Sequence, residues 1–478
     1  MFSFLGSIVV LILGYFIYGR LMERLFGVDE KRTTPAVAHP DGVDYVQLPL
    51  WRIFLIQFLN IAGLGPIFGA IMGIMYGPAA FLWIVLGSIF GGAMHDYLAG
   101  MMSVRSNGAG LPDLVGKELG IRVKQFMHVF SIGLMIVVGA VFVSGPAELL
   151  NTMSKGALGI SWWVVIIFIY YLMATLLPID KLIGRIYPFF GMVLLFMALG
   201  VFIALLVNWA PVPEFTIGFS NMHPAKLPIF PMMFVSIACG AISGFHATQS
   251  PLMARCIRNE KLGRRVFYGA MIMEGMVTLT WAAAASAFFG SIEGLHAFVA
   301  GMTPGTNHPA VIADMISREW LGPVGGLFAL LGIVAAPLST GDTALRSARI
   351  MLADVFRYDQ KAFKNRLLVA IPIFIVTYLL LQFDFAIIWR YLSWWNQTLS
   401  VFTLWSITVY LTKRKKFYGV SLLPALFMTA VSTSYILIAK EGLQLPPQLA
   451  YGISLSITLL TALLFFYKKS KMKLEIID

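Results

Sequence analysis

The chain has 478 residues, of which 59% are hydrophobic and 12% charged, and its mean hydropathy is +0.82. This composition excludes a soluble globular protein, and the near-continuous apolar runs exclude the alternating strands of a membrane barrel. The net charge of +12 does not by itself indicate nucleic acid, since basic loops orient membrane helices, and the two cysteines argue against a disulfide framework. We therefore expect an all-α polytopic membrane protein embedded in a lipid bilayer, with no nucleic-acid partner.

Thirteen hydrophobic stretches are predicted to cross the membrane. They cover residues 3–22, 51–77, 79–103, 124–144, 160–177, 184–208, 228–254, 266–290, 323–349, 366–383, 385–411, 418–438 and 447–467. The loops between them are short, and no stretch indicates a soluble domain.

The basic residues of the loops predict the orientation of the chain. If the N-terminus lies outside, 30 of the 35 Lys and Arg residues fall on inner segments. The other five lie one each on outer segments: Lys155, Lys226, Arg318, Arg390 and Lys440. Inner loops of membrane proteins carry an excess of Lys and Arg. The pattern predicts an outside N-terminus, with the Lys413–Lys416 loop and the C-terminus in the cytoplasm.

The second span carries a helix-breaking sequence at its midpoint, Asn60-Ile61-Ala62-Gly63-Leu64-Gly65-Pro66. Each Gly costs a helix roughly 1 kcal/mol and Pro removes an amide donor. Backbone groups freed at membrane depth must be satisfied by protein, by water or by a ligand. The break is therefore either a packing kink or a binding site.

The seventh span has a similar run, Cys239-Gly240-Ala241-Ile242-Ser243-Gly244-Phe245-His246. The two spans are five apart, so they have opposite orientations. Two interrupted helices at matching positions indicate an inverted-repeat transporter, although glycines also allow membrane helices to pack closely. The predicted parts are an extra N-terminal helix and loop (1–50), two five-helix repeats (51–210 and 211–412), and two C-terminal helices with a tail (413–478).

Several ionisable residues fall inside predicted spans, where charges are costly and usually functional. They are His95 and Asp96 in the third span, His246 in the seventh and Glu274 in the eighth. A His-Asp dipeptide also occurs in metal hydrolases, but no further ligands stand at workable spacing. A proton relay or a structural hydrogen bond fits better. His246 lies two residues after a break, where it could bind a carboxylate, carry a proton or be a satisfied core histidine.

Two further polar sites are ambiguous. Asp342 and Arg346 are four residues apart, so they share a helix face and are predicted to pair, either as an internal salt bridge or as part of a coupling site. Asn396 and Gln397 lie deep in the eleventh span, where they either line the pathway or join helices by hydrogen bonds.

The motifs together resemble the carbon starvation protein CstA family. The resemblance runs in order from about residue 41 to 412 and rests on Asp41–Val46, Ile61–Ile67, Ala93–Tyr97, Ile237–His246, Tyr268–Glu274, Ser339–Arg349 and Trp395–Leu399. Members are described as peptide transporters of starving bacteria, and some as proton-coupled pyruvate carriers. The chain is shorter than the long enterobacterial type. It also has Ile56-Gln57 where many relatives have a His-His pair, so no role of those histidines is carried over.

A more distant resemblance is to the LeuT fold of sodium-coupled symporters, in the amino acid–polyamine–cation superfamily. Its first core helix breaks at an Asn-x-x-Gly-Leu-Gly pattern like the one here. The resemblance implies a sodium site of carbonyl and hydroxyl oxygens, matched by Leu59, Ala62, Ala336, Ser339 and Thr340. Another sodium site of that fold uses an Asn where this chain has Pro66, so no second site is expected.

These observations predict a LeuT-like transporter of the bacterial inner membrane that imports a peptide or small carboxylate, with no cofactor other than a coupling sodium ion or proton. The substrate is expected between the breaks, near Asn60, Gly63, Leu64, Gly65, Cys239, Gly240, Ser243, Gly244, His246, Asn396 and Gln397. Candidate coupling residues are His95, Asp96, Glu274 and Asp342. The alternatives are an intramembrane enzyme that uses His95, Asp96 and His246, and a starvation sensor without transport.

Overall fold

The computed structural model describes the chain except for residues 43, 177–178, 303–306, 361, 384 and 472–478. The first half forms α1 (Phe2–Phe16), α2 (Tyr18–Phe26), α3 (Pro35–Ala38), α4 (Leu50–Ile61), α5 (Ala70–Ile74), α6 (Ala79–Leu86), α7 (Ala93–Val104), α8 (Leu111–Leu119), α9 (Ile121–Met153), α10 (Ile160–Leu176) and α11 (Ile179–Val207). The second half forms α12 (Phe234–Ile237), α13 (Gly244–Ala254), α14 (Gly269–Phe288), α15 (Ile292–Ala300), α16 (His308–Phe356), α17 (Phe363–Leu380), α18 (Phe385–Lys413), α19 (Gly419–Ile438) and α20 (Pro447–Lys469).

Short π and 3-10 segments interrupt or extend these helices. They are η1 (Gly65–Gly69), η2 (Gly87–Gly92), η3 (Phe215–Ile217), η4 (Ile229–Met233), η5 (Ala238–Gly240), η6 (Glu260–Leu262) and η7 (Arg264–Tyr268). No strand occurs among the described residues. The predicted all-helical class is therefore confirmed.

The spanning helices agree with the hydrophobic stretches in most places. Among the described residues, ten helices are long and apolar enough to cross a membrane, or eleven if the bent pair of α4 with η1 and α5 counts as one span. Helices also cover the two other predicted spans, as α10 and α18. The total of thirteen spans and the five-plus-five repeat stay predictions. Two boundaries differ clearly. Helix α16 begins at His308, well before residue 323, because a kink at Gly322 joins a preceding helical segment to the span. Helix α9 continues to Met153, well past residue 144.

Both predicted helix breaks are confirmed. In the second span, α4 ends at Ile61 and the helix resumes at Gly65, with a bend of 54° between the two parts. In the seventh span, the helix is interrupted between Ile237 and Gly244, and Ser243 has an extended backbone. The two interrupted helices therefore expose main-chain groups at the centre of the molecule.

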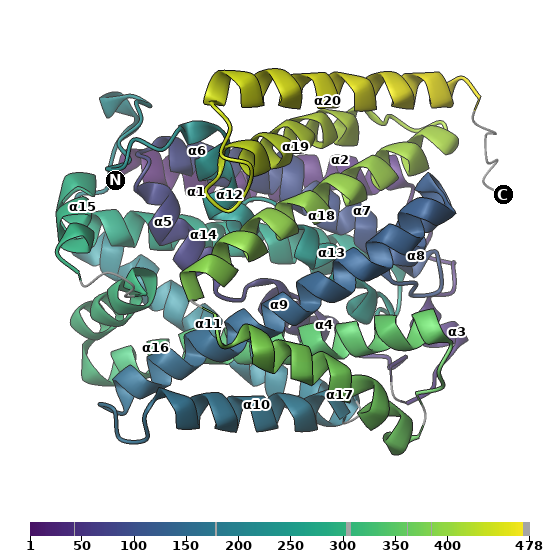
Figure 1. Cartoon of the computed structure of the whole chain (residues 1–478), viewed down its shortest axis with the longest axis horizontal. Coiled ribbons are helices and arrows are strands. Elements are labelled where there is room, and N and C mark those ends of the chain that lie inside the picture. Colours follow the sequence, from purple (N-terminus) through teal and green to yellow (C-terminus); the bar gives the residue numbers. More distant parts are fainter. Residues whose placement is uncertain (43, 177–178, 303–306, 361, 384, 472–478) are drawn as a thin grey trace.

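The broken helices lie inside a shell of longer ones. In the span that contains α14, 83% of the most apolar stretch is buried, whereas in α20 only 17% is buried. Helix α14 is therefore central and α20 peripheral. Figure 1 shows α20 along one edge and α10 along the opposite edge, with α13 and α14 between them. The most extensive helix contacts join α16 to α9 and α11. These three long helices form a packed unit beside the breaks.

We predict that an impermeant thiol reagent applied outside intact cells will label Lys440→Cys and spare Lys415→Cys. Both side chains are exposed, and the charge pattern places Lys440 outside and Lys415 inside. The wild-type protein serves as the control for background labelling. Its Cys256 thiol is buried, which raises its pKa to about 12 and suppresses the reactive thiolate. Labelling of Lys415→Cys from outside would refute the predicted orientation.

Candidate functional site

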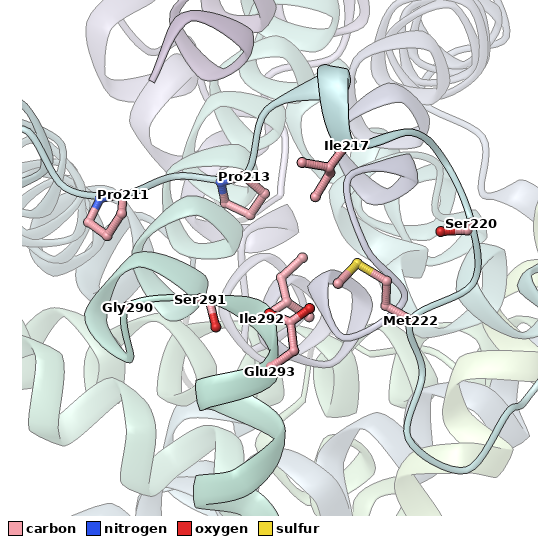
Figure 2. A pocket seen from close by; sticks show the side chains of 9 residues that line it. All are labelled: Pro211, Pro213, Ile217, Ser220, Met222, Gly290, Ser291, Ile292 and Glu293. Carbon is pink, nitrogen blue, oxygen red and sulfur yellow. The ribbon is translucent and has the colours of Figure 1, made fainter.

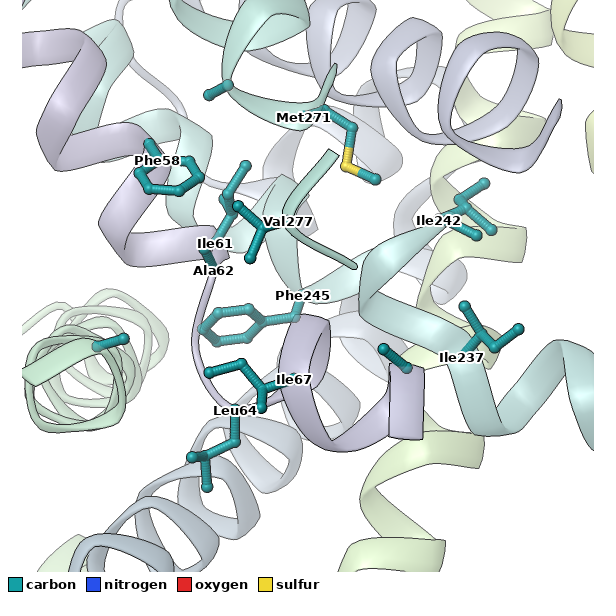
Figure 3. Close-up of a cluster of buried hydrophobic side chains, with 14 of the residues drawn as sticks. Phe58, Ile61, Ala62, Leu64, Ile67, Ile237, Ile242, Phe245, Met271 and Val277 are labelled. Carbon is teal, nitrogen blue, oxygen red and sulfur yellow. The ribbon is translucent and has the colours of Figure 1, made fainter. Parts of the chain in front are cut away.

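The two helix breaks touch each other. A Cβ atom built on Gly65 would lie 2.3 Å from the Cβ of Cys239, and one on Gly69 would lie 2.8 Å from the Ser236 carbonyl oxygen. Only glycine permits these approaches, since Cβ atoms do not come so close. Figure 3 shows Leu64 and Ile67 from the first broken span beside Phe245 from the second. The expectation that the two breaks face each other is therefore confirmed.

The second break is held by amide side chains of α18. The Asn396 Oδ1 accepts hydrogen bonds from the Ser243 hydroxyl, at 3.0 Å, and from the Phe245 amide, at 2.7 Å. Gln397 Nε2 donates to the Ile242 carbonyl at 2.9 Å. These bonds satisfy main-chain groups that the interrupted helix leaves open. Asn396 and Gln397 thus join helices in this structure, which was one of the two interpretations of their sequence position.

The first break contains a buried amide without a protein partner. Asn60 is fully buried at the end of α4, and neither its Oδ1 nor its Nδ2 has a hydrogen-bond partner in the part of the chain that the structure describes. Gly63 lies against Phe142 of α9 and the Thr340 hydroxyl of α16. Since buried polar groups are nearly always hydrogen-bonded, Asn60 is a candidate contact for a molecule bound at the break.

Four buried ionisable groups form a chain beside the second break. Asp96 on α7 lies between two imidazoles: its carboxylate oxygens are each 2.8 Å from a ring Nδ1, one of His95 and one of His246. The His246 Nε2 is 3.4 Å from a carboxylate oxygen of Glu274 on α14. All four side chains are fully buried. A proton on the Nδ1 of either histidine is therefore shared with Asp96. His246 Nε2 and Glu274 lie within ion-pair distance but make no hydrogen bond among the described residues.

Asp342 does not belong to this chain. The Tyr187 hydroxyl of α11 donates a hydrogen bond to Asp342, while Arg346 donates to the Ala174 carbonyl of α10. The predicted Asp342–Arg346 ion pair is therefore wrong for this structure. Sharing a helix face allows two side chains to meet, but here each finds a partner on a neighbouring helix instead.

The predicted sodium ligands lie at the junction of α16 and the first break. The Thr340 hydroxyl is 3.1 Å from the Leu59 carbonyl and 2.9 Å from the Ala336 carbonyl, and the Ser339 hydroxyl is 2.8 Å from the latter. Ala62 caps α4 at the same break. Four of the five residues that are predicted to supply oxygen ligands are thus linked by hydrogen bonds. Hydroxyl and carbonyl oxygens suit a hard cation.

Family comparisons match this arrangement to a known group of proteins. The model of the carbon starvation protein CstA family matches residues 1–160 and 147–293. An uncharacterized membrane protein of Haemophilus influenzae is 44% identical over 350 residues, which cover 62% of this chain and 93% of that one. The chain belongs to the CstA family.

Two named relatives of this CstA-family chain are transporters. The peptide transporter CstA of Bacillus subtilis is 28% identical over 59% of this chain and 57% of its own length. The pyruvate/proton symporter BtsT of Escherichia coli is 28% identical over 59% of this chain and 48% of its own length. The chain therefore spans about half the length of these named relatives.

A solved structure shares the fold of this CstA-family chain. The crystal structure of a mutant manganese transporter of Eremococcus coleocola superposes with a TM-score of 0.56 at 14% identity, covering 90% of this chain and 98% of the other. At this identity the likeness concerns the fold alone. Among the described residues, no group of three or more His, Cys, Asp or Glu could hold a metal ion.

Sequence reasoning missed several polar residues of the CstA-family core. The Tyr171 hydroxyl donates to the Phe142 and Pro337 carbonyls, and the Ser88 hydroxyl donates to the Gly240 carbonyl inside the second break. A lone tyrosine or serine in an apolar span gives no sign of whether it faces lipid or a neighbouring helix. Two of these three hydrogen bonds end on the carbonyl of a proline or of an interrupted helix. The proline and the interruption are visible in the sequence and indicate that a polar side chain is needed nearby.

A separate cavity of about 430 Å³ lies between the 209–228 loop and the start of α15. Figure 2 shows Pro213, Ile217, Met222 and Ile292 around it, with Glu293 nearby. None of the predicted substrate or coupling residues lines this space. It is therefore distinct from the site at the helix breaks.

Proposed function

We propose that this protein is a secondary transporter that imports a small carboxylate or peptide together with protons. The observation that carries the proposal is the buried His95–Asp96–His246–Glu274 chain directly beside two touching helix breaks. Buried ionisable groups in a membrane are costly and mark proton or substrate pathways. The named transporters BtsT and CstA support the same assignment for this family member.

The substrate binds where the two breaks meet. The helix α13 begins at Gly244, so the positive end of its dipole points into the break and favours an anionic carboxylate. Asn60 supplies an unpartnered amide from the first break. His246 follows the first residue of α13 by two positions, so a substrate bound at the break lies near its imidazole. A proton on this imidazole then stabilises the bound anion.

The coupling of substrate transport to protons depends on the carboxylates that flank His246. Asp96 and Glu274 flank its ring on two other helices, so the charge on the imidazole changes the attraction between α7, α13 and α14. A ligand shifts a conformational equilibrium only by binding one state better than the other. Proton and substrate together favour one arrangement of the broken helices, and release of both favours the other, which gives alternating access.

Solute counterflow tests the proposal against an enzyme or a sensor. Liposomes that contain the purified protein are loaded with unlabelled pyruvate, or with an unlabelled dipeptide, and diluted into a trace of the labelled compound. A carrier produces transient accumulation of unaltered label with no ion gradient. Chemical conversion of the label would indicate an enzyme, and binding without accumulation would indicate a sensor. Either result overturns the proposal.

Sodium is the second candidate for the coupling ion, because Thr340 joins α16 to the Leu59 carbonyl at the break. If sodium drives transport, the Ser339→Ala/Thr340→Ala double variant will lose the sodium dependence of uptake while the protein still inserts. The expected reason is the loss of both hydroxyl ligands from the oxygen cluster. If uptake by the wild-type protein is unchanged when choline replaces sodium, the hydroxyls only bond to carbonyls a turn back and sodium is excluded as the driver.

A further inference from the structure

Two arginines near the end of α16 are buried without an ion-pair partner among the described residues. Arg346 is 1% exposed and Arg349 is 3% exposed. They are three residues apart on the helix, so their side chains lie on the same side of it. A buried charge without a partner is costly, because nothing offsets the loss of its hydration. This pair therefore calls for a compensating anion.

The protein itself satisfies these guanidinium groups only in part. Arg346 Nη2 donates to the Ala174 carbonyl, and Arg349 Nη1 donates to the Gln360 side chain. Among the described residues, the Nε atoms of both arginines have no hydrogen-bond partner. Two buried Nε–H donors thus remain open. Guanidinium groups match the geometry of planar oxyanions, to which they can donate two parallel hydrogen bonds.

The surrounding charges do not neutralise the pair. Among the described residues, the charged groups that act electrostatically on Arg349 are the cations Arg346 and Arg366 and the anion Asp44. Asp342 acts on Arg346 but its carboxylate is also engaged by the Tyr187 hydroxyl. Among the residues that the structure describes, three arginines thus share two carboxylates. The excess positive charge lies toward the Phe356 end of α16, which the loop charges predict to be cytoplasmic.

We propose that Arg346 and Arg349 form a binding site for a small oxyanion, a carboxylate or inorganic phosphate, in the inner half of the membrane. This site lies on α16 and is separate from the helix breaks. If the ligand is a carboxylate, the site receives the substrate of the proposed transport reaction before release. If it is phosphate, the site senses a cytoplasmic anion. In both cases the two guanidinium groups hold the oxygen atoms.

Thermal unfolding of the purified protein in detergent tests the site without any gradient or transport. The Tm is measured against increasing sodium pyruvate and, separately, sodium phosphate, with sodium chloride at matched ionic strength as the reference. A ligand that binds only the folded state raises Tm with concentration, and the dependence gives Kd. Arg346→Gln and Arg349→Gln should each weaken binding at least about tenfold, since a charge-assisted hydrogen bond contributes about 1.5–3 kcal/mol.

Matched variants keep the test decisive. Arg318→Gln makes the same change on α16 at a side chain that is 52% exposed and paired with Asp314, so it should bind like the wild type. Arg349→Lys keeps the charge but loses the planar fork, so it should bind with intermediate affinity even if Arg346→Gln does not fold. Gly65→Leu disturbs the proposed substrate site at the helix breaks, so the anion binding that this variant retains belongs to the arginine site and separates the two proposals.

A shift with pyruvate alone assigns the site to the transported carboxylate, and a shift with phosphate alone assigns it to a cytoplasmic anion. A shift with both supports a general oxyanion site. The proposal is overturned if neither salt raises the Tm of the wild-type protein above the chloride reference. It is equally overturned if the Arg349→Gln variant binds both anions with wild-type affinity.

Discussion

Asp96→Asn is expected to lower the initial rate of proton-driven uptake by at least about a hundredfold. Asp96 is the shared partner of His95 and His246, with both oxygens at 2.8 Å from an imidazole nitrogen. Each such bond to a charged group contributes about 1.5–3 kcal/mol, and 1.4 kcal/mol is a factor of ten. An amide has no charge to hold a proton on either ring, so the variant should lose coupling to the proton gradient.

The control for this prediction is a second carboxylate-to-amide change outside the buried chain. Asp113 on α8 has a side chain that is 38% exposed and pairs with Lys124, and Asp113→Asn should transport like the wild type. Counterflow, which requires no net proton movement, should fall far less than driven uptake in Asp96→Asn. Accumulation by Asp96→Asn at the wild-type rate under a proton gradient would show that the buried chain does not carry the coupling.

Gly65→Leu is expected to abolish transport, with a loss of about a hundredfold or more, in a protein that still inserts in the membrane. A Cβ at this position would lie 2.3 Å from the Cβ of Cys239, so the two breaks must separate to admit any side chain. Overpacking of this kind costs about 1–3 kcal/mol, and leucine also favours regular helix through the break. Counterflow of labelled substrate, normalised to inserted protein, measures the effect.

The same substitution at Gly452 is the matched control. Gly452 lies on the peripheral helix α20, and a Cβ there would meet no atom within 4 Å. Gly452→Leu should therefore transport like the wild type. Full counterflow by Gly65→Leu would show that the contact between the breaks does not form part of the pathway.

The helix breaks were predictable because local chemistry determines them. Gly63, Gly65 and Pro66 weaken a helix whatever surrounds them, and the structure has its 54° bend at that point. The chain of buried ionisable groups was predictable only as a set of candidates. That Asp96 rather than Glu274 lies between the two histidines depends on how α7, α13 and α14 pack, which no local pattern encodes.

The errors have the same origin. The spacing of Asp342 and Arg346 fits an ion pair, yet Asp342 contacts Tyr187 on α11 and Arg346 contacts Ala174 on α10. Helical spacing says which residues share a face but not which neighbouring helix competes for them. The early start of α16 was missed because the segment before the Gly322 kink is less apolar than a span, although it is still helical.

Uptake into liposomes under separated ion gradients tests the central claim most directly. Liposomes that contain the wild-type protein receive labelled pyruvate, or a labelled dipeptide, under an inward proton gradient in choline buffer, or under an inward sodium gradient at equal pH. Uptake of one of these substrates should be driven by the proton gradient, persist in choline and collapse when a protonophore is added. Uptake that needs sodium and ignores the proton gradient would contradict proton coupling through Asp96, and no gradient-driven uptake of either substrate would contradict the proposed transport.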